Sequence, residues 1–409
     1  MKISCCREKW PSRFSLSGSA PDVFVPGPQS AALWLEYEER LPEKAVAKNA
    51  PVYPGMLLAR HPNPGKGDLH CPVTGVVSEA GPQGALIAVG LPAPKTPKKT
   101  ENEETPPGSD AEAKVPEIPV TRPVNLETLN GEELARALKE LGIHTDRLTC
   151  LCDTLIINGL NPDPGVLWAG PMLKAQTDVI KAGVSLLHRL TPATNLILAI
   201  GQGMDTEFAD LDVRPVPAVY PSSLDPLVIK SVTGKECPTG VCVVGLHEIW
   251  KLGRVARTGL PVTETVLTLN GVNYLAPLGT PARDLLGFAG ITLNDGDALI
   301  FNGPLRGVAQ SRPEIGVTSQ TYGICVIRKD ETPPLQGAAP CIACGECVRV
   351  CPARIQPDLL SRHAELGQDA KCGSLHIEAC LNCGLCTYVC LARRPVLQHL
   401  RLARRRMSV

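Results

Sequence analysis

The chain has 409 residues, enough for roughly two to four domains of about 100–200 residues each. Hydrophobic residues make up 44% of the chain but aromatic residues only 4%, so aliphatic cores are expected. The 41 basic and 41 acidic residues balance, which argues against a nucleic-acid-binding protein.

The cysteine content is high, with 17 residues. Residues 1–17 contain no apolar core of signal-peptide length, and no apolar run precedes Cys5 and Cys6. No stretch of about 20 apolar residues occurs, so no transmembrane segment is expected. We therefore expect a reducing, cytoplasmic location, where cysteines serve as metal ligands more often than as disulfides.

Residues 1–90 are expected to form a small β domain, followed by a linker over residues 91–122. Ala50–Ala59 contains a turn followed by an apolar run, and Cys71–Val77 has the same pattern of turn residues next to apolar residues. Residues 91–122 are dominated by Pro, Lys and Glu and have few large apolar residues. Such a segment cannot bury enough surface to offset its ordering entropy, so we expect it to be disordered.

Residues 123–215 have the pattern of an α/β region. Leu126–Leu141 and Leu173–Leu190 have apolar residues at helical spacing, whereas Asp153–Gly159 and Asn195–Gly201 are short apolar runs. A strand, a helix and a strand in succession form a βαβ unit, which predicts a parallel sheet.

The rest of the chain divides into a β-rich region and a helical, cysteine-rich region. Residues 216–330 are expected to complete the α/β domain and add strands such as Val241–Val244, Thr265–Leu269 and Ala298–Phe301. Residues 331–409 are expected to be mainly helical, with helices over Ile355–Leu366 and Val396–Arg406.

Two copies of a C-x₂-C-x₂-C-x₃-C motif lie in this last region. The first motif consists of Cys341, Cys344, Cys347 and Cys351, and the second of Cys380, Cys383, Cys386 and Cys390. This spacing is typical of [4Fe–4S] ligation, and in two-cluster proteins the fourth cysteine of each motif ligates the other cluster. We therefore predict one cluster on Cys341, Cys344, Cys347 and Cys390, and a second on Cys380, Cys383, Cys386 and Cys351.

Zinc is the alternative for these cysteines, but zinc sites usually use two C-x₂-C pairs. The remaining cysteines are expected to pack singly as small hydrophobic residues; they are Cys71, Cys150, Cys152, Cys237, Cys242, Cys325 and Cys372. No catalytic residue is predicted, since the histidines are scattered and no P-loop or Ser/His/Asp arrangement occurs.

The C-terminal tail is basic, and no acidic residue follows Glu378. Its arginines are Arg393, Arg394, Arg401, Arg404, Arg405 and Arg406. The tail could dock on an acidic ferredoxin, anionic lipid or a membrane subunit. The alternative is a solvated helix end, where arginine is also favoured.

Several segments together resemble a known family. They are Cys71–Val77, Asp153–Gly159, Thr233–Glu236, Thr268–Gly271, Leu278–Pro281, Asn302–Gly307 and the two cysteine motifs. In this order they resemble the C subunit of the Rnf complex, the ion-translocating ferredoxin:NAD⁺ oxidoreductase of bacterial membranes. The resemblance implies a β barrel-sandwich domain, a flavin-domain-like α/β region, a β-grasp (SLBB-like) region and a helical two-cluster ferredoxin module. It also implies other complex subunits and a ferredoxin or cytochrome as partners, and a peripheral position on the inner membrane.

The chain departs from this family where cofactors would bind. The family's Gly-Gly-Ala-Gly-Phe-Pro-like loop is replaced by Ile143–Leu148, and its acidic Glu-Cys-Glu-Pro stretch by Leu160–Pro164. A glycine loop lets backbone amides approach flavin phosphate and pyrophosphate, which the residues of Ile143–Leu148 do not allow. We therefore do not expect FMN or NAD to bind.

Three functions remain open from the sequence. The first is an electron-transfer subunit that relays electrons through its clusters without an NADH site of its own. The second is an FMN-dependent NADH dehydrogenase or cobalamin-reductase-like enzyme with a different loop. The third is an assembly protein whose clusters are structural.

Overall fold

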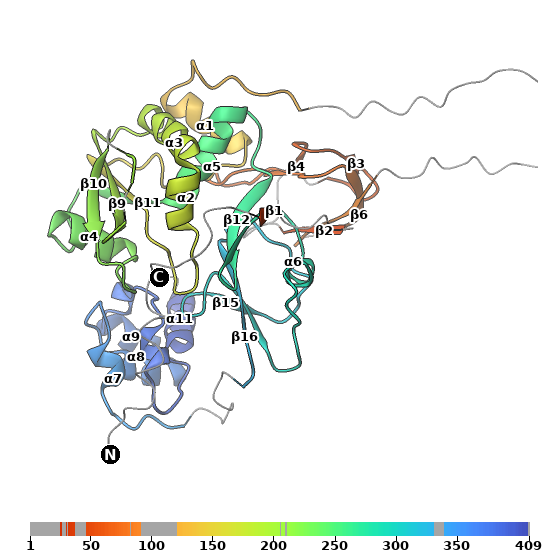
Figure 1. Ribbon diagram of the computed structural model, residues 1–409. Helices are drawn as coiled ribbons and strands as arrows, with labels where there is room; N and C mark the ends of the chain where they lie inside the picture. Colours follow the sequence, from red (N-terminus) through yellow and green to blue (C-terminus); the bar gives the residue numbers. More distant parts are fainter. Residues whose placement is uncertain are drawn as a thin grey trace, which may run out of the picture.

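The computed structural model describes residues 25–26, 30, 32–36, 46–81, 83–90, 121–204, 206–208, 211–330 and 339–407 (Figure 1). Cys5, Cys6 and nearly all of the predicted linker over residues 91–122 lie outside these described residues. None of the helices in the described ranges combines the length and apolar character needed to cross a membrane.

A four-stranded parallel sheet lies at the centre of the α/β region. Its strands are β8 (Thr154–Asn158), β9 (Asn195–Gly201), β10 (Asp212–Val216) and β11 (Val241–Gly245), in the spatial order β10-β9-β8-β11. All three strand pairs are parallel. This arrangement confirms the mixed α/β class with a parallel sheet that the strand–helix–strand pattern predicts.

Both faces of this sheet are buried. Leu155 and Ile157 join the core formed with helices α1 (Gly131–Glu140), α3 (Thr177–Leu190) and α5 (Leu246–Thr258). Ile156 lies between them in the strand and faces the opposite side, where it packs with α4 (Asp225–Thr233). Burial on both faces explains why β8 and β9 are continuous apolar runs rather than alternating ones.

Two helices differ from their predicted bounds by more than two residues. The segment predicted as one helix over Leu173–Leu190 forms α2 (Ala169–Ala175) and α3, which are separated at Gln176. The helix predicted from Leu126 begins only at Gly131, because the carbonyl oxygens of Leu126 and Leu129 instead accept hydrogen bonds from the Arg189 guanidinium.

The N-terminal β region contains two sheets. One has the order β2-β7-β6-β3, and the other pairs β4 with β5. The strands are β2 (Ala32–Glu36), β3 (Pro51–Val52), β4 (Leu57–Ala59), β5 (Leu69–His70), β6 (Gly75–Gly81) and β7 (Gly84–Val89).

A six-stranded mixed sheet lies between the α/β region and the N-terminal sheets (Figure 1). In spatial order its strands are β1 (Val25–Pro26), β13 (Val272–Pro277), β12 (Glu264–Leu269), β16 (Gly323–Ile327), β14 (Ala298–Phe301) and β15 (Val308–Gln310). Helix α6 (Ala282–Phe288) contributes Leu285 and Leu286 to its core. Strand β1 pairs in parallel with β13, so the segment just before the N-terminal β region belongs to this sheet.

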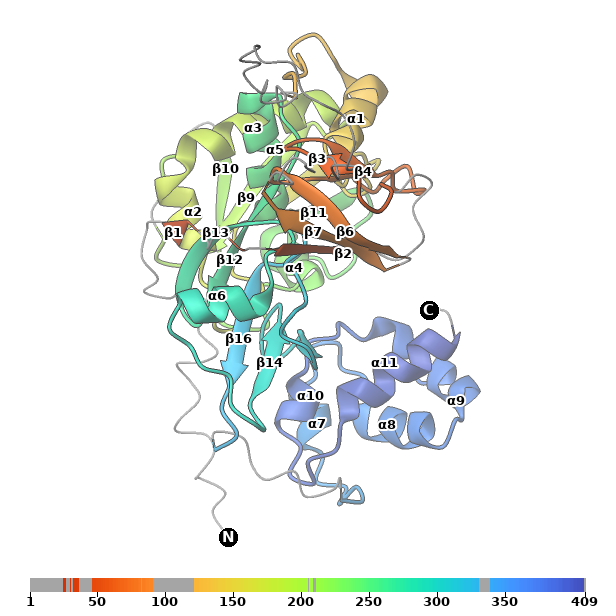
Figure 2. The same ribbon diagram turned by 90° about the vertical axis from the view of Figure 1, so that its right-hand side faces the viewer.

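The C-terminal module is helical (Figure 2). Its elements are α7 (Glu346–Arg349), α8 (Pro357–Glu365), α9 (Asp369–Ser374), the 3-10 turn η2 (Ile377–Ala379), α10 (Leu385–Tyr388) and α11 (Val396–Met407). Each cysteine of the second motif lies 39 positions after its counterpart in the first. Helices α7 and α10 obey the same offset, so the module is a structural duplication.

Candidate metal centre in the C-terminal module

The backbone of the two cysteine motifs bends in the same way. Gly345 and Gly384 precede α7 and α10 with φ angles of 73° and 79°. Ala343 and Asn382, which precede the second cysteine of each motif, also have positive φ angles, of 54° and 52°. These left-handed residues let each loop turn sharply between its cysteines.

The first group of cysteines lines a single pocket. Cys341, Cys344 and Cys347 from the first motif and Cys390 from the second all contribute to its wall. The backbone N–H of Arg394 donates a hydrogen bond to the Cys390 sulfur at 3.4 Å. One pocket therefore collects four thiols from two segments of the chain.

The second group consists of Cys380, Cys383, Cys386 and Cys351. Burial raises the pKa of Cys383 to about 11, and the nearby Cys380 and Cys351 raise it further. Burial likewise raises the pKa of Cys386 to about 12, with Cys383, Cys380 and Cys351 adding to the effect. Cys351 also packs in the same hydrophobic cluster as Cys380 and Cys386 of the other motif.

Backbone N–H groups face several of these sulfurs. The N–H groups of Val348, Asn382, Leu385 and Thr387 donate to Cys347, Cys380, Cys383 and Cys386, respectively. Without a metal, burial favours neutral thiols, whereas these donors and a bound cation favour thiolates. Four thiols converging with N–H donors are a donor set that fits a [4Fe–4S] cluster.

The second group lies against the α/β region. The Tyr220 hydroxyl donates to the Cys383 carbonyl oxygen at 2.6 Å, and Cys383 shares a hydrophobic core with Ile156. A Cβ atom on Gly384 would lie 2.3 Å from the Leu305 carbonyl oxygen, so the loop and the Asn302–Gly307 turn are in direct contact. The cysteines of this group are thus the ones nearest to the parallel sheet.

Asp163 holds that turn in place, a role the sequence did not reveal. The Asp163 carboxylate is fully buried and accepts hydrogen bonds from the N–H groups of Leu305 and Arg306, at 3.1 and 3.0 Å. The only signal in the sequence was an acidic residue in an otherwise apolar, proline-rich stretch. Asp163 and Tyr220 together connect the sheet to the cysteine loop.

The segment Ile143–Leu148, which replaces the glycine loop, is packed against the N-terminal β region. Ile143, His144, Thr145 and Leu148 are buried. His144 Nδ1 accepts a hydrogen bond from the Gly67 N–H at 3.0 Å, and the Thr145 N–H donates to the Gly65 carbonyl oxygen at 2.8 Å. The backbone N–H of Thr145 and a ring nitrogen of His144 are thus engaged within the protein, although His144 also lines a pocket together with Gly67 and Gly142.

The arginines of the basic tail form several contacts within the chain. Arg401 donates to the Arg306 carbonyl oxygen, Arg404 to that of Cys380 and Arg406 to that of Ala364, at 2.8, 3.1 and 2.7 Å. Arg394 pairs with Glu365. Several arginines of the tail therefore form hydrogen bonds or ion pairs within the chain. Docking of the tail to a partner remains a prediction.

Comparison with known proteins gives consistent relatives, although no family model matches the chain. It is 25% identical over 377 residues to the C subunit of the ion-translocating oxidoreductase complex of Rhodobacter capsulatus, covering 83% of this chain and 71% of that protein. It is 28% identical over 250 residues to the protein of the same name from Edwardsiella ictaluri, covering 55% and 31%. The C subunit of the proton-translocating ferredoxin:NAD(+) oxidoreductase complex of Clostridium ljungdahlii is 26% identical over 243 residues, with coverages of 54% and 53%.

Among solved structures, the NAD⁺-reducing [NiFe]-hydrogenase in its H2-reduced state matches with a TM-score of 0.40 and 14% identity, over 61% of this chain and 55% of the hydrogenase chain. The curated relatives agree with one another, and together they confirm the resemblance on which the sequence motifs converge: this chain is similar to the C subunits of ion-translocating oxidoreductase complexes.

Proposed function

We propose that this chain is an electron-transfer subunit of a membrane-associated oxidoreductase complex and relays electrons through two [4Fe–4S] clusters. The observation that carries the proposal is the pocket lined by Cys341, Cys344, Cys347 and Cys390, which draws its ligands from both motifs. Such clusters supply one-electron redox chemistry when bound. The chain's own residues hold the thiols together, bury Cys347, Cys383 and Cys386, and donate N–H groups to the sulfurs.

The contacts suggest an order along the relay. Cys383 and its motif lie against the parallel sheet through Tyr220 and the Asn302–Gly307 turn. In contrast, Cys341 is half-buried and Cys344 is exposed. We propose that the Cys380, Cys383, Cys386 and Cys351 site exchanges electrons on the α/β side, and the other site with an external partner.

The exchange of fourth ligands can be tested with paired alanine substitutions. If ligands are exchanged, Cys341→Ala with Cys390→Ala damages one site, and the anaerobically reconstituted double variant keeps about half of the wild-type iron and sulfide. Cys341→Ala with Cys351→Ala damages both sites and loses nearly all of it.

The opposite pattern, with more iron in the Cys341/Cys351 double variant, would show that each motif holds its own cluster. Cys372→Ala is the matched control, because Cys372 is a buried cysteine of the same module outside both groups. Zinc in place of iron, or no reversible reduction by dithionite, would overturn the proposal.

We propose further that the chain has no NADH site and receives electrons from another subunit or a ferredoxin or cytochrome. The packing of Ile143–Leu148 against Gly65 and Gly67 supports this, because the backbone there is not free to cradle a phosphate. The test is flavin quantitation and NADH oxidation with the purified chain. One FMN per chain, or NADH-driven reduction of an acceptor without an added flavoprotein, would instead establish an FMN-dependent dehydrogenase.

A further inference from the structure

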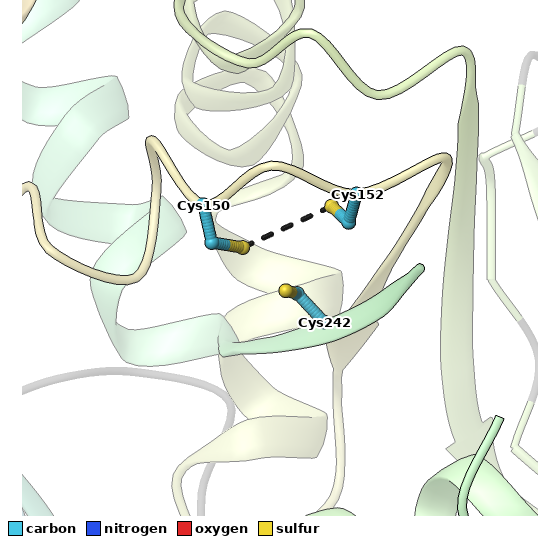
Figure 3. A group of neighbouring side chains, drawn as sticks. All are labelled: Cys150, Cys152 and Cys242. Carbon is cyan, nitrogen blue, oxygen red and sulfur yellow. Dashed lines mark hydrogen bonds between the residues drawn. The ribbon is translucent and has the colours of Figure 1, made fainter. Parts of the chain in front are cut away.

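Three cysteines outside the duplicated motifs come together at one end of the parallel sheet (Figure 3). Cys150 and Cys152 lie in the loop that leads into β8, and Cys242 is the second residue of β11. Strands β8 and β11 are direct neighbours, with Cys242 opposite Leu155. The strand register therefore brings together thiols that are far apart in the sequence.

The three sulfur atoms face one another. The Cys150 and Cys152 sulfurs are 3.8 Å apart, and all three sulfurs lie within 4.8 Å of one another. Figure 3 shows the side chains converging from three directions on a common point. We expected these cysteines to pack singly as small hydrophobic residues; they do contact the main core, but as a group.

The spacing suits a metal ion better than a disulfide. Thiolates bound tetrahedrally to zinc at about 2.3 Å are roughly 3.8 Å from one another. A disulfide requires its sulfurs to be about 2.05 Å apart. The separation of Cys150 and Cys152 thus matches two ligands of one ion.

We propose that Cys150, Cys152 and Cys242 form a Zn²⁺ site, separate from the two cysteine groups of the C-terminal module. Among the described residues, no fourth His, Cys, Asp or Glu ligand atom belongs to this group. The fourth position of the ion is therefore filled from solvent, to which the neighbouring Leu151 is 90% exposed.

Without a metal, the thiols of this group are neutral. Burial raises the pKa of Cys150, and the neighbouring Cys242 and Cys152 raise it further, since three adjacent thiolates repel one another. A divalent ion removes this repulsion and displaces the thiol protons. Zinc affinity is consequently expected to rise with pH.

The location separates this group from the electron relay. The group lies where β8 begins and β11 starts, whereas ligands of parallel sheets bind beyond the carboxyl ends of the strands. Tyr220 and the cysteine loop around Cys383 contact the opposite face and end of the sheet. A bound ion would fasten the loop before β8 to the edge strand β11 without touching the electron relay.

The test uses the full chain, purified anaerobically with its iron sites reconstituted, incubated with one equivalent of Zn²⁺ and gel-filtered. We expect one zinc per chain by elemental analysis, and three sulfur ligands at about 2.3 Å by zinc X-ray absorption. Cys150→Ala and Cys242→Ala should each lose this zinc while the iron content stays unchanged. Cys325→Ala, which removes a half-buried cysteine of β16 outside the group, should keep it.

Several outcomes would overturn the proposal. They are no zinc retained by the wild-type chain, zinc retained equally by Cys150→Ala and Cys242→Ala, or a Cys150–Cys152 disulfide in the anaerobic protein. If the variants fail to fold, X-ray absorption of the wild-type protein decides alone: fewer than three sulfur neighbours around zinc would contradict the site. Because iron is measured separately, loss of the zinc site is distinguishable from failure of the proposed electron relay.

Discussion

The Tyr220 hydroxyl donates a hydrogen bond of 2.6 Å to the Cys383 carbonyl oxygen, across the boundary between the α/β region and the helical module. Tyr220 is only 4% exposed, and burial raises the pKa of its phenol, so the hydroxyl stays protonated and remains a donor. This bond fixes the backbone of a proposed cluster ligand to the sheet. The position of the cysteine loop is thus set partly from outside its own module.

Tyr220→Phe removes this donor and leaves the Cys383 carbonyl oxygen buried without it. We expect the free energy of unfolding of the holoprotein to fall by about 1–3 kcal/mol. Anaerobic urea denaturation measures the change. Tyr274→Phe is the control, since Tyr274 is a similarly buried tyrosine in the six-stranded sheet. An equal loss in both variants would mean that the hydroxyl of Tyr220 has no special role.

Gly384 and Gly345 form a matched pair at equivalent positions of the duplication. Both have left-handed φ angles, so alanine at either position costs about 1–2 kcal/mol of backbone strain. Only at Gly384 would the added Cβ also clash, 2.3 Å from the Leu305 carbonyl oxygen, whereas nothing lies within 4 Å at Gly345. Gly384→Ala should therefore destabilise the chain clearly more than Gly345→Ala.

The measurement for this pair is anaerobic denaturation combined with limited proteolysis of the whole chain. We expect faster cleavage in Gly384→Ala alone, because the clash separates the cysteine loop from the Asn302–Gly307 turn. Indistinguishable stability and cleavage in the two variants would show that this contact does not hold the module in place.

The sequence predicts the bounds of strands that consist of a continuous apolar run between turn residues. Asn195–Gly201 and Ala298–Phe301 form strands with the predicted bounds, because uninterrupted apolar runs between turn residues suffice to define them. The break at Gln176 was not predictable from apolar spacing, which continues in register from α2 into α3. There the Thr177 hydroxyl bonds back to the Leu173 carbonyl oxygen at 2.8 Å.

Contacts between residues far apart in the sequence could not be predicted from it, because they depend on which strands pair and in what register. Cys242 meets Cys150 and Cys152 only because β11 adds to the far side of β8. Similarly, Asp163 reaches Leu305 and Arg306 because the sheet and the turn are folded against each other. The assignment of the eight motif cysteines to two clusters stays a prediction, for which the ligand-exchange experiment is decisive.

Asp163 should make stability depend on pH. Burial raises its pKa to about 7, against the opposing effect of the Leu305 and Arg306 N–H groups, compared with about 3.9 in an unfolded chain. Between these values the folded state binds more protons than the unfolded state, so stability falls as pH rises toward 7. From pH 5.5 to 8 this amounts to about 2 kcal/mol.

The check is anaerobic denaturation of wild type and Asp163→Asn at several pH values in that range. Asparagine does not titrate, so the contribution of this position to the slope should vanish in the variant. Its overall stability is also lower, because an amide presents one N–H₂ group toward the two backbone N–H donors. Parallel pH profiles for the two proteins would contradict the assignment.

Lys251 and Glu248 form an ion pair inside the α/β region. Lys251 Nζ lies 2.7 Å from Glu248 Oε1 and 3.2 Å from the Ser319 carbonyl oxygen, and its side chain is 1% exposed. Burial disfavours the charged form of Glu248, but Lys251 and His247 outweigh burial and lower the pKa of its carboxyl group. Lys251→Met should cost about 3–5 kcal/mol of unfolding free energy, because it leaves a buried carboxylate unpaired.

Adding Glu248→Met to Lys251→Met should restore most of this stability, since an apolar pair can replace a buried ion pair at little cost. A double-mutant cycle by chemical denaturation measures the coupling. A double variant as unstable as the sum of the single variants would show that the two charges do not interact.

Arg404 should tune the reduction potential of the proposed cluster on Cys380, Cys383, Cys386 and Cys351. Its guanidinium donates to the Cys380 carbonyl oxygen at 3.1 Å. Burial raises the pKa of Cys380, whereas the positive charges of Arg404 and Arg401 lower it. Reduction adds negative charge to a cluster, so Arg404→Gln should lower the potential, by on the order of tens of millivolts.

Arg405→Gln removes a neighbouring exposed charge and serves as the control. It should shift the potential much less, because water screens an exposed charge. Anaerobic redox titration followed by EPR measures both variants, and an equal shift in the two would mean that the tail acts only through its net charge.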